Sequence, residues 1–234
     1  MNRKILCLLG LFVLFSCEIN SSSELSEVFE NTRGASELVV HSEYADESSK
    51  GMRKRMKEDL QIIGEKVSDV WFTDAQGEHY LILSNTGKIN DMEFPESGDK
   101  FYDVELYTYL FTTSSEALIL DWMIKDSVVK CGPEIYAEFG GEAYDLTDLD
   151  NDGMKEVWIN YSIGCNSKNV PLKMRVIMTE NKSQYVMDGE KRVKIGPDNF
   201  KGGDYTFGEN VSNIATSFKD HFKKIWKEQV DQVF

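Results

Sequence analysis

Histidine, cysteine, proline and positive charge are all scarce in this sequence. Its 234 residues include three His, four Cys and four Pro, and 26 Lys plus Arg stand against 40 Asp plus Glu, for a formal net charge of −14. The histidines, His41, His79 and His221, lie far apart, which argues against a His-based zinc or iron site. Affinity for a polyanion comes mainly from cations that neutralise its phosphates, so the charge balance also argues against nucleic acid as a partner.

Long apolar runs are also missing, apart from one at the start of the chain. Residues 1–16 carry Arg3 and Lys4, then the apolar run Ile5 to Phe15, which is shorter than the roughly 20 residues of a membrane-spanning helix. This pattern is typical of an export signal. Its end, Leu14-Phe15-Ser16-Cys17, resembles the lipobox of bacterial lipoproteins.

The lipobox resemblance implies that residues 1–16 are removed and that Cys17 carries a lipid. Such a protein is expected at the outer membrane, anchored by the lipid and facing the cell surface or the periplasm. An ordinary signal peptide with an unmodified cysteine is the alternative. Residues 17–36 are rich in Ser, Glu and Asn and lack an apolar period, which predicts a flexible acidic tether.

Residues 37–234 are expected to form a single β-rich domain. Apolar residues mostly alternate up to about residue 194, as in strands with one buried face. Asp74-Ala75-Gln76-Gly77 and Glu180-Asn181-Lys182-Ser183 each separate two apolar runs, which predicts two hairpin turns. The segment 101–112 is apolar on both faces and reads as a central strand. The predicted fold class is mainly β (α+β), an antiparallel meander or a partial-propeller-like sheet.

The C-terminal part changes to a helical period. From Asn210, a suitable N-cap, apolar residues recur three or four positions apart, which predicts an amphipathic helix over residues 210–231. We expect this helix to cover the sheet. Its lysine-bearing opposite face leaves a partner-binding or membrane-surface role open.

The acidic stretch from Asp148 to Glu156 carries the most chemical information. Carboxylates fall at loop positions 1, 3, 5 and 9, and Gly153 stands at position 6, where a sharp turn is needed. Calcium takes six to eight oxygens, and a loop that curls round the ion supplies them from alternate side chains and one backbone carbonyl. The expected ligands are Asp148, Asp150, Asp152, the carbonyl of Met154 and Glu156. A solvated acidic turn is the alternative.

The surroundings of this loop distinguish it from an EF-hand. Position 12 is Ile159 and not the bidentate Glu of an EF-hand, and the flanking apolar residues alternate as in strands. The stretch Asp-Leu-Asp-Asn-Asp-Gly-Met-Lys-Glu-Val resembles the calcium loops between strands of FG-GAP and VCBS repeats. That resemblance implies a structural Ca²⁺ site between two strands.

A second resemblance covers the stretch from Tyr144 through Cys165 to Asp188-Gly189. It is similar to Gram-negative, Bacteroidota-type lipoproteins described as surface polysaccharide biosynthesis proteins. The resemblance implies a role in the cell envelope and a glycan or an envelope protein as partner. Binding of a glycan would call for exposed aromatic side chains beside the loop, for example Trp158 and Tyr161.

Two cysteines remain for the exported domain, because Cys7 lies in the signal and Cys17 is the lipidation site. Cys131 and Cys165 bracket the acidic loop and form an even pair in an oxidising compartment, which predicts a disulfide. Two separate buried thiols are the alternative.

The motifs of common enzyme classes are missing from the sequence. There is no Gly-x-Ser-x-Gly, His-Glu-x-x-His, phosphate loop or Gly-x-Gly-x-x-Gly. We therefore expect a non-catalytic, lipid-anchored envelope protein with a structural calcium loop. The alternative is a secreted carbohydrate-active hydrolase that uses a carboxylate pair which sequence does not reveal.

Overall fold

The structure is a computed structural model that describes residues 53–54, 60–93, 99–114, 117–165 and 169–232. All of them belong to one compact unit, Ala45–Phe234. The predicted signal, Cys17 and the tether lie outside the described residues. In the described part, no helix has both the length and the apolar character to cross a membrane.

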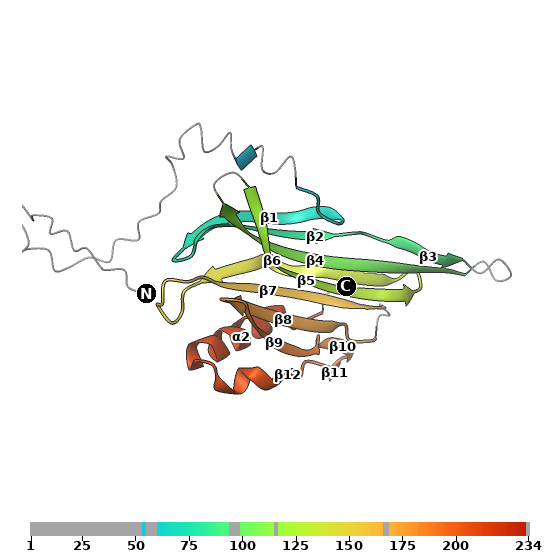
Figure 1. The fold of residues 1–234 in the computed structure, drawn as a ribbon. Coiled ribbons are helices and arrows are strands. Elements are labelled where there is room, and N and C mark those ends of the chain that lie inside the picture. Colours follow the sequence, from blue (N-terminus) through green and yellow to red (C-terminus); the bar gives the residue numbers. More distant parts are fainter. Residues whose placement is uncertain (1–52, 55–59, 94–98, 115–116, 166–168, 233–234) are drawn as a thin grey trace, which may run out of the picture. The chain divides into compact units, whose positions relative to one another are not determined.

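Most described residues belong to two five-stranded antiparallel sheets (Figure 1). The first sheet has the order β1-β2-β4-β3, with β5 paired to the other side of β4. Its strands are β1 (Glu65–Asp74), β2 (Gly77–Asn85), β3 (Ile89–Glu93), β4 (Lys100–Ser114) and β5 (Ala117–Cys131). The expected central strand is confirmed, because β4 pairs with β2 and β3 on one side and with β5 on the other.

The second sheet has the order β12-β9-β8-β7-β6. Its strands are β6 (Ile135–Thr147), β7 (Glu156–Cys165), β8 (Lys173–Glu180), β9 (Ser183–Glu190) and β12 (Tyr205–Phe207). A separate two-stranded hairpin consists of β10 (Val193–Gly196) and β11 (Asn199–Lys201). Both predicted hairpin turns are confirmed, since Asp74 pairs with Gly77 and Glu180 with Ser183.

The two sheets pack face to face around the main core. Leu81, Leu106 and Leu110 of the first sheet share one apolar cluster with Ile159 and Ile177 of the second. The predicted antiparallel meander is thus divided between two layers. The mainly β fold class with a C-terminal helix is confirmed.

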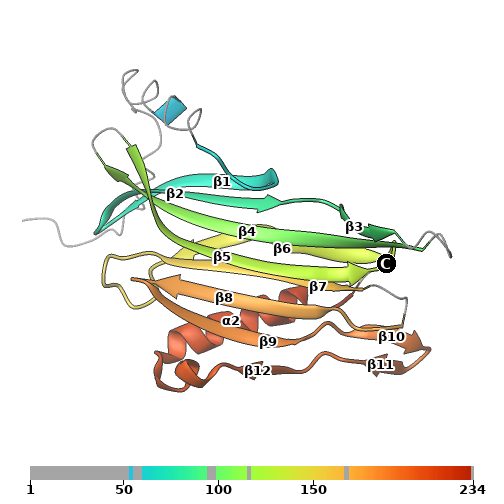
Figure 2. The ribbon, with the colours of Figure 1, turned by 45° about the vertical axis from the view of Figure 1, so that its right-hand side comes forward.

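The far face of the second sheet is covered by α2 (Thr216–Gln229), as Figure 2 shows. Phe218, Phe222 and Trp226 of this helix pack against Trp158 and Met178 of the sheet, which confirms the expected covering role. The predicted helix 210–231 is realised in two pieces, because a 3-10 turn, η1 (Glu209–Asn213), precedes α2. Ile214 and Ala215 have extended ψ values of 165° and 149° and separate the two, so Asn210 does not cap α2.

Candidate metal centre

The acidic loop joins β6 to β7, as predicted, at one end of the second sheet. Side chains alternate between the two faces of a strand. Leu146 and Val157 point into the core between the sheets, whereas Trp158 packs against α2. Thr147 and Glu156, which pair across β6 and β7, therefore lie on the α2 face of the sheet.

Backbone contacts with its own carboxylates curl the loop. The N–H of Asp152 donates to Asp150 Oδ1 (3.3 Å), and the N–H of Met154 donates to Asp152 Oδ1 (2.8 Å). Gly153 has φ = 86°, a conformation that a residue with a side chain rarely adopts. The sharp turn expected at Gly153 is thus confirmed.

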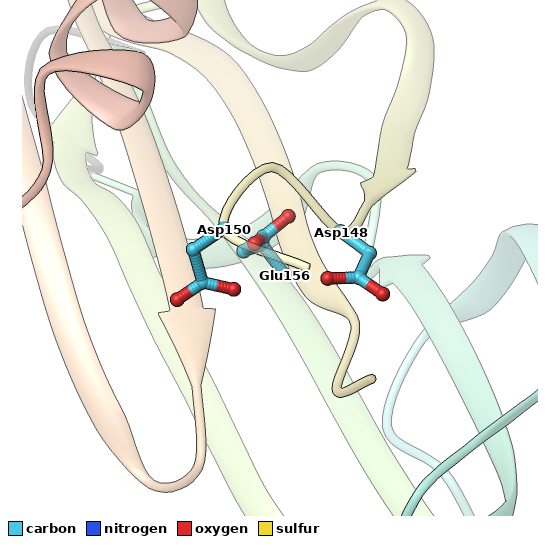
Figure 3. Close-up of side chains that lie close together, drawn as sticks. All are labelled: Asp148, Asp150 and Glu156. Carbon is cyan, nitrogen blue, oxygen red and sulfur yellow. The ribbon is translucent and has the colours of Figure 1, made fainter. Parts of the chain in front are cut away.

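The curled loop brings its carboxylates into two groups that share Asp150. In the first group, one oxygen each from Asp148, Asp150 and Glu156 lies within 4.8 Å of the others. In the second group, the same holds for Asp150, Asp152 and Glu180. Figure 3 shows the first group, with Glu156 between Asp150 and Asp148 in this view. Such groups can hold a metal ion, and four of the predicted ligands lie in them.

Glu156 is the most deeply buried member of the cluster and accepts the most hydrogen bonds. Its side chain has no exposed surface, and its carboxylate accepts the N–H of Leu149 at 2.9 Å (Oε1) and 3.1 Å (Oε2). The hydroxyl of Thr147 donates to Oε2, and the indole N–H of Trp158 donates to Thr147 Oγ1 at 2.7 Å. This chain of hydrogen bonds connects the buried carboxylate to the core beneath α2, where Trp158 contacts Phe222.

Two further carboxylate oxygens of the cluster are buried without a hydrogen-bond donor among the described residues, namely Asp148 Oδ1 and Glu180 Oε1. Burying a charged oxygen without a partner is costly unless a cation or a proton compensates it. Burial, followed by the charges of Asp150 and Glu156, raises the pKa of Glu180 from 4.5 to about 7. The site therefore has an excess of negative charge that a divalent cation would balance.

Glu180 is the member of the cluster that sequence reasoning missed. In the sequence it opens the predicted turn after β8, 24 positions beyond Glu156. The register of β7 and β8 pairs Val157 with Thr179, which places Glu180 beside Glu156. Only this pairing across the sheet could have indicated it. The role of the Met154 carbonyl as a calcium ligand stays a prediction.

The first sheet also contacts the loop, through the turn between β1 and β2. Ala75 donates its N–H to the carbonyl of Gly153 (2.8 Å), and Lys155 donates its N–H to Asp74 Oδ2 (3.3 Å). Gln76 Nε2 donates to Asn181 Oδ1 (3.1 Å), in the turn that follows Glu180. The loop thus lies against both sheets.

Asp74 is fixed in turn by a buried histidine. His79 Nε2 is hydrogen-bonded to Asp74 Oδ1 (2.9 Å), and His79 Nδ1 lies 3.3 Å from Thr112 Oγ1. His79 is 2% exposed. This histidine therefore supports the turn beneath the loop and is not grouped with the carboxylates.

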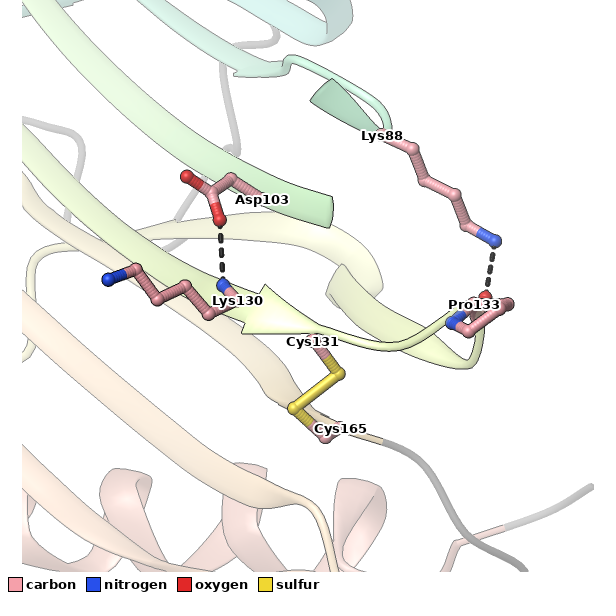
Figure 4. The surroundings of a disulfide bond; sticks show 6 residues. All are labelled: Lys88, Asp103, Lys130, Cys131, Pro133 and Cys165. Carbon is pink, nitrogen blue, oxygen red and sulfur yellow. Dashed lines mark hydrogen bonds between the residues drawn. A yellow bond between two sulfur atoms is a disulfide. The ribbon is translucent and has the colours of Figure 1, made fainter. Parts of the chain in front are cut away.

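The predicted disulfide is present at the other end of β7. Cys131, the last residue of β5, is bonded to Cys165, the last residue of β7, with Cα atoms 5.5 Å apart. Figure 4 shows two neighbouring contacts: Lys88 Nζ donates to the carbonyl of Pro133 (2.6 Å), and Lys130 N–H donates to Asp103 Oδ1 (2.7 Å). The bond therefore joins the two sheets.

The expectation that Trp158 and Tyr161 are exposed beside the loop is wrong. Their exposed fractions are 1% and 2%. The first sheet covers one face of β7 and α2 covers the other, so Tyr161 is shielded on the first face and Trp158 on the second. These two rings cannot serve as a platform for a glycan in this fold.

Comparisons with known proteins identify no relative. No protein-family model matches the chain, and neither a curated protein nor a solved structure matches it.

Proposed function

We propose that this chain is a non-catalytic, lipid-anchored protein of the cell envelope, whose β domain is fixed at one end by a bound Ca²⁺. The proposed ligands are the side chains of Asp148, Asp150, Asp152, Glu156 and Glu180, together with the carbonyl of Met154. These oxygens suit calcium, which takes six to eight oxygen ligands, better than magnesium, which usually retains several waters.

The observation that carries the metal proposal is the unbalanced charge at the buried end of the cluster. Glu156 has no exposed surface, and Asp148 Oδ1 and Glu180 Oε1 are buried without a donor among the described residues. A loop that only faced solvent would have no reason to bury these oxygens. The FG-GAP-like and VCBS-like spacing of the loop supports the same assignment.

A structural role suits this site better than a catalytic one. The carboxylate of Glu156 accepts hydrogen bonds from Leu149 and Thr147 and has no exposed surface, so it is not placed to reach a substrate. The loop contacts the β1–β2 turn through Gly153 and Lys155. A bound ion would therefore hold the loop against both sheets.

The envelope part of the proposal is supported by sequence features alone. The lipobox-like Leu14-Phe15-Ser16-Cys17 supports a lipid on Cys17 at the outer membrane. The resemblance to lipoproteins of surface polysaccharide biosynthesis supports an auxiliary role in polysaccharide assembly, with a glycan or an envelope protein as partner.

Calcium titration of residues 45–234 tests the metal site. Calcium modules of extracellular proteins bind at about 10⁻⁴–10⁻³ M, so about 10 mM Ca²⁺ should stabilise the fold by roughly 1–3 kcal/mol. The melting temperature should then rise by roughly 3–10 °C. Calorimetric titration should give one Ca²⁺ per chain with Kd in that range.

Matched variants separate the loop from nonspecific effects of calcium. Asp150→Ala removes a side chain shared by both carboxylate groups and should abolish the rise in melting temperature. Asp198→Ala, at an exposed position in the turn between β10 and β11, should leave it unchanged. A wild-type melt that calcium does not move would refute the site.

A further inference from the structure

The β10–β11 hairpin exposes an aromatic ring between two cations. Lys194 pairs with Phe200 and Val193 with Lys201. Val193 is buried (1% exposed), so the face of the hairpin that carries it lies against the domain. The opposite face carries Phe200, which is 53% exposed. Arg192 Cζ and Lys194 Nζ lie 5.7 Å and 5.9 Å from its ring centre.

The hairpin also exposes a second apolar side chain near its tip. Ile195 is 41% exposed and lies at the register shift between Lys194 and Gly196. A residue at such a shift has no partner on the opposite strand. Residues 197–202 are all exposed, so little of the tip is used for packing within the domain. The tip therefore presents two apolar side chains and nearby lysines to its surroundings.

The charge of this segment contrasts with that of the whole chain. Residues 191–203 contain four bases, Lys191, Arg192, Lys194 and Lys201, and one acid, Asp198, whereas the chain carries a net −14. Arg192 is engaged by Asp231 through two hydrogen bonds of 2.7 and 2.9 Å. Lys194 and Lys201 are both exposed. They are the cations of this segment most available to an external anion.

We propose that the β10–β11 hairpin docks on an anionic lipid surface. Apolar and aromatic side chains flanked by lysines bind such surfaces by placing the rings at the headgroup boundary and the ammonium groups near lipid phosphates. A body with an excess of acids is repelled by the same surface, so a locally basic, apolar hairpin is the part that can approach it. Phe200 and Ile195 would enter the boundary with Lys194 beside the headgroups. Lys201 pairs with Val193 on the domain-facing side and would reach the headgroups only from the exposed edge of the hairpin.

This contact does not depend on the proposed lipid at Cys17 or on the proposed calcium site. If both attachments exist, they act together, because the lipid keeps the domain close to the membrane and the hairpin adds apolar and electrostatic attraction to its surface. The hairpin would then also determine which side of the domain faces the lipid.

Vesicle binding of residues 45–234, which lack Cys17, tests the proposal. This segment contains all the described core clusters, so it keeps the packing of the hairpin. Co-sedimentation with phosphatidylglycerol–phosphatidylcholine vesicles should exceed that with pure phosphatidylcholine vesicles by at least about fivefold in low salt. Raising NaCl to about 0.5 M should abolish the difference, because salt screens the lysines.

Variants then assign the binding to the hairpin. Phe200→Ser should weaken vesicle binding, and Lys194→Glu with Lys201→Glu should weaken it on the order of tenfold. Lys223→Glu with Lys224→Glu changes the charge equally on the exposed face of α2 and should leave binding unchanged. Circular dichroism melts confirm that each variant is folded.

Fluorescence quenching measures whether the side chain at position 200 enters the lipid. A Phe200→Trp variant should show indole fluorescence that brominated acyl chains quench, beyond the quenching of the four native tryptophans. Equal binding to neutral and anionic vesicles, or loss of binding only in the α2 double variant, would overturn the proposal. So would fluorescence of the introduced indole that the brominated lipid does not change.

Discussion

The backbone N–H of Ala75 donates a 2.8 Å hydrogen bond to the carbonyl oxygen of Gly153. Ala75 lies in the turn between β1 and β2 of the first sheet, and Gly153 lies in the acidic loop of the second. The loop is therefore held by a sheet other than its own. Changes in that distant turn should affect the metal site.

Asp74 accepts the N–H groups of Lys155 and Gln76 and is hydrogen-bonded to His79. Asp74→Ala leaves these groups without an acceptor, at a cost of about 1–3 kcal/mol. The melting temperature should fall by several degrees and the affinity for Ca²⁺ should also fall, as thermal melts and calorimetric titration would show. Unchanged calcium affinity would mean that the turn does not position the loop.

Glu180→Gln should raise the melting temperature in the absence of calcium and weaken the binding of calcium. The pKa of Glu180 is raised to about 7 in the fold, so the folded state retains a proton that the unfolded chain loses above pH 4.5. Stability is therefore lost as the pH rises through this window, and above it the charged side chain is destabilising. In chelator, the variant should melt roughly 2–4 °C higher at pH 8, about 1 kcal/mol after screening by solvent, and equally at pH 4.

With calcium present, the same variant loses a charged ligand and should bind the ion more weakly. Calorimetric titration at pH 8 measures this loss. If the variant bound Ca²⁺ as tightly as the wild type, Glu180 would be excluded from the ligand set.

Thr147→Val tests the hydrogen bonds that fix Glu156. The substitution keeps the shape of the side chain but removes the donor to Glu156 and the acceptor of the Trp158 N–H. An unpartnered buried N–H costs about 1–3 kcal/mol, so the melting temperature should fall. Calcium affinity should fall as well, and Thr147→Ser should restore both. Recovery of stability without recovery of affinity in the serine variant would contradict this link.

Reduction of the Cys131–Cys165 bond should destabilise the domain strongly. The two cysteines are 34 residues apart, and closing a loop of that length contributes roughly 3–4 kcal/mol in the chain-entropy account. The melting temperature should fall by roughly 10 °C in reductant. The double variant Cys131→Ala with Cys165→Ala should show the same fall without reductant, and no further change when reductant is added.

Local sequence signals predicted the features that depend on neighbouring residues. The turns Asp74–Gly77 and Glu180–Ser183 each depend on the residue types of only four consecutive positions, so the sequence alone indicates them. The carboxylate spacing of the acidic loop is equally local, and the structure brings Asp148, Asp150 and Glu156 together.

Features that depend on strand register or on the packing of one sheet against the other could not be predicted from local sequence signals. Glu180 joins the cluster only through the β7–β8 register, and Ala75 reaches Gly153 only because the sheets pack face to face. The burial of Trp158 and Tyr161 has the same origin. Alternation along β7 indicates two faces, but it cannot show that the first sheet covers one and α2 the other.

Strand β7 begins at Glu156, whose carboxylate is bonded into the acidic loop, and ends at Cys165, which is covalently joined to β5. Strands usually fray from their termini inward, and here each terminus is secured by a different kind of bond. Local opening of β7 then requires both attachments to fail or the whole domain to unfold. Its central amides should consequently be among the last to exchange with deuterium.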